Sequence, residues 1–151
     1  MNSILTFRIA GLPLQILSDT PKRTLFQILP SFLPFESDTD DAEPLFQLAI
    51  SKEIPPQNSE TIRTFDTGNG HISVARLNKG GYQLDIRDLH HTCCQLQTDT
   101  TFTHCRCALS GNRHATGFGL DTALMLCFAF AASKCKTLLI HASAVRSQGY
   151  G

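Results

Sequence analysis

The sequence has no excess of charge of either sign, because thirteen basic residues balance thirteen acidic residues. Proteins that bind nucleic acid or anionic membranes usually carry a strong positive field, so we expect neither as a partner. A long hydrophobic run is also missing: the longest, residues 123–132, is about half of the roughly 20 residues that cross a bilayer. The first residues do not resemble a signal peptide, so we expect a cytoplasmic protein.

The chain has six cysteines, and a reducing cytoplasm favours free thiols over disulfides. Metal-capable residues crowd residues 90–107: His90, His91, Cys93, Cys94, His104, Cys105 and Cys107. No C-x-x-C pair occurs there, so we interpret the cysteines as small buried apolar side chains. Zinc bound by Cys105, Cys107 and either Cys94 or Cys93 is the alternative.

Short segments of alternating apolar and polar residues predict a mostly antiparallel sheet of about seven or eight strands. The clearest signal is a three-stranded meander over residues 61–89. Asn69-Gly70 and Gly80-Gly81 supply the positive φ angles of its two turns. In its third strand, Tyr82, Leu84 and Ile86 share the face expected to be buried. Thr20 followed by Pro21 predicts the start of a short helix.

An apolar stretch near the end of the sequence predicts one buried helix over about residues 120–134, with Asp121 as its N-cap. The run TLLIHASAV that follows predicts a buried strand. The predicted fold class is therefore α+β. We divide it into a β-rich N-terminal domain, 1–117, and a helix and strand, 118–151; one continuous domain, 1–151, is the alternative.

The last eleven residues, HASAVRSQGYG, place Gly149 and Gly151 eight and ten residues after His141. This segment resembles the one that precedes the P-loop in HPr kinase/phosphorylase-related P-loop kinases, whose fold is like that of phosphoenolpyruvate carboxykinase. An FRIAGL first strand and a helix like ALMLCFAFA also resemble members of this group. The match is closest over the last fifteen or so residues and loose elsewhere.

The resemblance implies a transferase that uses ATP and Mg²⁺ to phosphorylate a protein or a small molecule. It places His141 beside the γ-phosphate as a catalytic residue, and Gly149 and Gly151 in the turn that leads to the P-loop. The sequence contains no G-x-x-x-x-G-K-[ST]. We therefore expect the N-terminal part of a longer kinase, truncated before the Walker-A loop and inactive alone.

Several alternatives stay open. The chain could be a free-standing binding or regulatory module of unknown partner, with His141 a core histidine, and it could form a homo-oligomer. Two further sites are conceivable. One is an acidic metal site at Asp38, Asp40 and Asp41; the other is an anion site where Arg113 and His114 lie in a loop before the helix.

Overall fold

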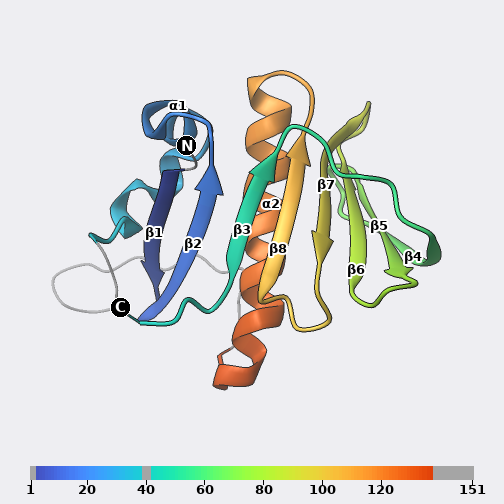
Figure 1. The fold of residues 1–151 in the computed structure, drawn as a ribbon. Coiled ribbons are helices and arrows are strands. Elements are labelled where there is room, and N and C mark those ends of the chain that lie inside the picture. The colour runs from blue at the N-terminus through green and yellow to red at the C-terminus, as the bar shows by residue number, and fades with distance from the viewer. Residues whose placement is uncertain (1–2, 39–41, 138–151) are drawn as a thin grey trace, which may run out of the picture.

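The computed structural model describes residues 3–38 and 42–137 as a single eight-stranded sheet with helices on one face (Figure 1). The strands are β1 (Ser3–Ile9), β2 (Leu12–Ser18), β3 (Gln47–Ser51), β4 (Ser59–Asp66), β5 (His71–Leu77), β6 (Tyr82–Arg87), β7 (Thr92–Thr98) and β8 (His104–Leu109). The helices are α1 (Lys22–Ile28) and α2 (Arg113–Ala132), with short 3₁₀ turns η1 (Pro30–Phe35) and η2 (Ser133–Cys135). The predicted α+β class is confirmed.

The strand order is β1-β2-β3-β8-β7-β6-β5-β4. β3 pairs in parallel with both β2 and β8, and every other neighbouring pair is antiparallel. The meander predicted over residues 61–89 forms the far end of this sheet, as β4, β5 and β6. Residues 52–58 connect β3, in the middle of the sheet, to β4 at its edge (Figure 1).

The sheet has one apolar and one polar face. Along β6, Leu84 and Ile86 are buried toward the helices, and Gln83 lies on the opposite face, as the alternation predicted. Two glutamine pairs join strands on that polar face: Gln47 Nε2 donates to Gln15 Oε1 at 2.8 Å, and Gln97 Nε2 to Gln83 Oε1 at 3.1 Å. Apolar packing therefore has to come from the helix side.

Helix α2 lies across β6, β7 and β8 and begins at Arg113, earlier than predicted. Its N-cap is Asn112, whose side chain accepts a hydrogen bond from Ala115 N, so the prediction of Asp121 as N-cap is wrong. Gly117 and Gly119 are the reason why the sequence predicted a loop where the first turns of α2 lie. They are glycines because a Cβ would meet Ile28 O at 3.0 Å and Cys93 O at 2.8 Å, respectively.

The cap of α1 and the β4–β5 turn also differ from the predictions. The helix α1 has Pro21, not Thr20, at its N-cap position, and no side chain caps it. In the β4–β5 turn the positive φ angles belong to Gly68 and Gly70, not to Asn69. The Gly80-Gly81 turn is as predicted, with φ angles of 93° and 86°.

The division of the chain at 117/118 falls inside α2, and the predicted strand TLLIHASAV lies outside the described residues apart from Thr137. By length and composition, the 23 residues Arg113–Cys135 could cross a membrane. Half of their most apolar window is buried within the fold.

Candidate functional site

The residues that the resemblance marks as functional, His141, Gly149 and Gly151, lie outside the described residues, and so do Asp40 and Asp41 of the acidic alternative. The described residues offer two other regions with the form of a site. One is a polar region around the N-terminal turns of α2. The other is an apolar pocket between α2 and the β4–β6 end of the sheet.

The stretch dense in cysteine and histidine is divided by the fold. His90 and His91 lie in the turn between β6 and β7, whereas His104 begins β8 at the opposite end of the strands. Within residues 3–38 and 42–137, no three His, Cys, Asp or Glu side chains are grouped as a metal ion requires.

Five of the six cysteines are buried free thiols, and Cys135 is exposed. Cys94, Cys105 and Cys107 lie on the helix side of the sheet with Cys127 of α2 in the same core cluster. A hydrogen bond with Cys107, together with burial, raises the pKa of Cys94, and Cys105 and burial act in the same way on Cys127. A thiol that stays protonated is a poor nucleophile and metal ligand, so these cysteines act as small apolar side chains.

The polar region begins where the end of α1 meets the start of α2. Arg113 donates to Gln27 O from Nη2 at 2.7 Å and from Nε at 3.2 Å, which ties the two helices together. Beside this contact is a hollow of about 620 Å³, lined by Gln27, Ile28, Leu29, Pro30, Ser31, Arg113, His114, Gly117, Phe118 and Asp121. Burial raises the pKa of Asp121. Arg113 and His114 are thus in the first turn of α2, and their predicted loop placement is wrong.

A second hollow, of about 570 Å³, lies on the other side of His114 and Phe118. Its remaining lining comes from two turns and consists of Asn69, Asp88, Leu89 and His90. The backbone N–H groups of His91 and His90 each donate to Asp88 Oδ1 at 2.7 Å and lower the pKa of Asp88 to about 2. His114 therefore lines both hollows, one together with Arg113 and the other together with Asp88.

The polar region contains an arginine, two histidines and two aspartates, the kinds of side chain that hold anions or move protons. Two Arg113 donors, Nε and Nη2, bind Gln27 O, and Asp88 Oδ1 accepts from the backbone of its own turn, so both side chains already have a local structural role. No nucleophile–base pair or metal cluster accompanies His114 in the described part of the chain. The arrangement supports a structural role for these side chains better than catalysis.

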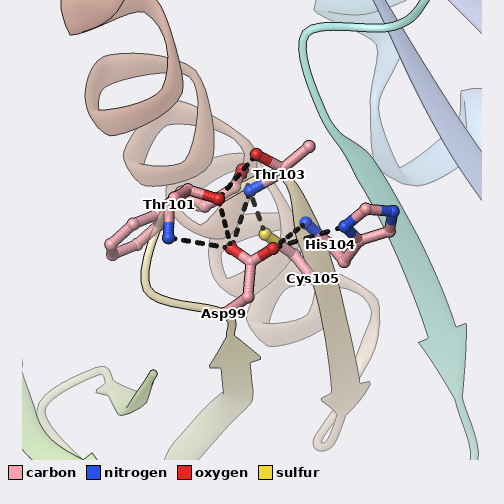
Figure 2. Close-up of polar contacts among 6 residues, drawn as sticks. Asp99, Thr101, Thr103, His104 and Cys105 are labelled. Carbon is pink, nitrogen blue, oxygen red and sulfur yellow. Dashed lines mark hydrogen bonds and ion pairs between the residues drawn. The ribbon is translucent and has the colours of Figure 1, made fainter. Parts of the chain in front are cut away.

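The turn between β7 and β8 is built on Asp99 (Figure 2). Asp99 Oδ1 accepts from Thr101 N at 3.0 Å and Thr103 N at 2.9 Å, and Oδ2 accepts from His104 N at 3.1 Å. Burial raises the pKa of Asp99, but these backbone donors outweigh it and hold the pKa below its usual value. Between the donors, Phe102 adopts a left-handed backbone with φ 57°, which costs on the order of 1 kcal/mol or more.

Phe102 is one wall of the apolar pocket. Its ring stacks between Tyr82, at 5.8 Å between centroids, and Phe130 of α2, at 4.5 Å. The pocket has a volume of about 370 Å³ and is lined by Phe65, Ile72, Val74, Tyr82, Leu84, Phe102, Leu126 and Phe130. Its floor is buried at Leu84, and its rim is half exposed at Phe65 and Phe130.

No protein-family model, no curated protein and no solved structure matches this chain. The resemblance to HPr-kinase-related proteins therefore rests on the sequence features named above.

Reasoning from the sequence missed the apolar pocket. The alternation along β5 and β6 indicated an apolar face, but not that α2 leaves part of that face uncovered. One signal was present: the segment 123–132 is apolar all round, which predicts packing on every side, although one helix on one sheet cannot provide it. The sequence signal for the Asp99 turn is weaker. An aspartate followed by threonines favours turns in which side chains form hydrogen bonds with the backbone.

Proposed function

We propose that residues 1–151 are the N-terminal region of an HPr-kinase-like, ATP-dependent phosphotransferase, in which this region is a scaffold and does not itself bind ATP. The proposal keeps the roles that the resemblance implies: His141 in phosphoryl transfer, and Gly149 and Gly151 in the turn before the P-loop. ATP and Mg²⁺ belong to the complete protein, and a protein or a small molecule accepts the phosphoryl group.

The observation that carries the proposal is the outward side of α2. Phe118, Thr122, Met125 and Ala129 follow one another at helical spacing on this side. Three of these four side chains are apolar, and Met125 is 47% exposed. A helix that is apolar on all sides is normally enclosed. A nucleotide-binding core placed against this stripe, which we call the outer stripe of α2, supplies that enclosure.

The proposal is tested first by calorimetric titration of the 151-residue protein with Mg-ATP. No binding is expected, because the sequence has no Walker-A pattern to cradle the phosphates. Clear binding overturns the proposal.

The second test is the coding sequence downstream of codon 151. The proposal expects an open frame that continues into an apolar strand and G-x-x-x-x-G-K-[ST]. In that longer protein, His141→Ala should lower ATP turnover strongly with little change in melting temperature. His104→Ala is the matched control, because His104 is an exposed residue at the start of β8. This control variant should leave ATP turnover unchanged.

A free-standing binding module is the second candidate function, and the apolar pocket favours it. A stop codon after codon 151 would support this candidate.

A further inference from the structure

We infer that the apolar pocket is a binding site for a small anionic amphiphile. The ligand class is an aliphatic carboxylate whose tail enters the pocket and whose head group lies at Arg63. This inference goes beyond phosphoryl transfer and does not depend on it.

The lining of the pocket selects an apolar tail. Its aliphatic residues Ile72, Val74 and Leu84 come from two neighbouring strands, and Leu126 comes from α2. The Tyr82 hydroxyl is the only polar side-chain group among the lining residues. Pockets of this size, largely apolar and formed between a sheet and a helix, are typical of small-molecule sites.

The pocket is held open by its aromatic wall. Phe102 is fixed at its unusual φ of 57° by the hydrogen bonds of the Asp99 turn, and its ring is inclined by only 24° to Tyr82 and 20° to Phe130. Collapse of α2 onto β5 would have to break this stack. Because the pocket is preformed, ligand binding does not lose free energy to ordering the side chains that line the pocket.

The charge at the mouth selects an anion. Arg63 and Phe65 lie two residues apart on β4, opposite Val74 and Ile72 of the pocket. The Arg63 guanidinium carbon is 5.4 Å from the centroid of the Phe65 ring, which is at the rim. Among the described residues no carboxylate forms an ion pair with Arg63.

The other arginine on this face, Arg76, lies further from the pocket and has an acidic residue opposite it in the register. Arg76 lies two residues beyond Val74 on β5, and Glu60 of β4 is directly opposite it in the register. Arg63 has Val74 opposite instead. The positive charge nearest the pocket lining is therefore that of Arg63, which lies over the Phe65 ring, and a carboxylate complements it.

The volume sets the length of the tail. A cavity of about 370 Å³ holds about a dozen groups the size of water or methylene, at roughly 30 Å³ each. A chain of about eight to twelve carbons fits. Another protein strand fits less well, because β4 carries charged residues and an irregular register between Thr61 and Arg63, features that protect sheet edges from pairing.

The test is calorimetric titration of the 151-residue protein with decanoate below its micelle concentration, and with decanol as the same tail without charge. We expect saturable one-to-one binding of decanoate and weaker binding of decanol. Arg63→Gln should weaken decanoate binding by roughly fivefold, the scale of an exposed ion pair, and leave decanol binding unchanged. The matched control is Arg106→Gln, on the opposite face of β8, which should change neither affinity.

A second variant tests the pocket itself. Leu126→Trp should fill it and abolish binding of both ligands; near-ultraviolet circular dichroism and melting temperature establish that the variant is folded. Absence of saturable binding by the folded wild type overturns the inference, and so does an Arg63→Gln variant that binds decanoate as well as wild type. Sedimentation showing a dimer that decanoate does not dissociate also contradicts it, because a second copy would then cover the pocket.

Discussion

The centre of the sheet and its β4–β6 end differ in what covers them and, at the edge strand β4, in composition. At the centre, Leu96 and Cys107 are fully buried beneath α2. At the far end, Phe65 of β4 is 47% exposed on the same apolar face. On this face β7 and β8 carry leucine and cysteine, whereas β4 carries Arg63 and Phe65, and α2 contacts β6, β7 and β8. Burial here therefore follows both the position of the helix and the composition of the edge strand. The uncovered end is where a ligand or a partner has room.

Thiol reactivity should show the largest contrast between closed and open parts of the molecule. In the native protein one thiol, that of Cys135, should react rapidly with a disulfide reagent, and after denaturation all six should react. The other five are buried, and a buried thiol is shielded from the reagent. A count of reactive thiols under native and denaturing conditions measures this. Two or more fast thiols in the native protein would mean that the core beneath α2 opens readily.

Neighbouring residues of α2 provide the next contrast. Leu124→Ala should lower the free energy of unfolding by about 2–5 kcal/mol, because Leu124 is buried in the core and its removal leaves a cavity. Met125→Ala, one residue further on the outer stripe of α2, should cost less than about 1 kcal/mol, because Met125 is 47% exposed. Urea denaturation measures both. Equal losses would show that the outer stripe is already covered.

Acid should weaken the turns at the two ends of β7. The pKa of Asp88 is about 2 in the folded protein and that of Asp99 is also lowered, whereas an unfolded aspartate titrates near 3.8. A lowered pKa stabilises the fold above the unfolded value, and this contribution is lost as the pH falls from about 5 toward 2. Melting temperature measured over this range should fall. The Asp99→Asn variant should have a lower melting temperature than wild type at neutral pH, and its melting temperature should fall less steeply as the pH decreases. An unchanged dependence of melting temperature on pH would contradict the role of Asp99.

Asp121 should give the smallest effect, with the opposite sign. Burial raises the pKa of Asp121, so ionisation costs stability as the pH rises through the raised pKa. Asp121→Asn should therefore raise the melting temperature slightly at pH 7 and have no such effect near pH 3. A lower melting temperature at pH 7 would indicate that the carboxylate has a partner.

The sequence predicted the α+β class, the β4–β6 meander and the buried face of β6, because these depend on local alternation and turn glycines. It mispredicted the start of α2, because the close approach of Gly117 to Ile28 and of Gly119 to Cys93, which leaves no room for a Cβ, is tertiary information. The apolar pocket could not be predicted, since it depends on where α2 lies over the sheet. The Phe102 stack also joins residues from a turn, a strand and a helix.

Hydrogen–deuterium exchange resolved by residue tests most directly whether the two ends of the sheet differ as described. The account predicts that amides of β7, paired on both sides and covered by α2, exchange orders of magnitude more slowly than those of β4, which pairs only with β5. Decanoate should slow exchange in β5 and β6 and leave β2 unchanged. Protection of β4 equal to that of β7 in the free protein would contradict the account, because the open end would then be covered.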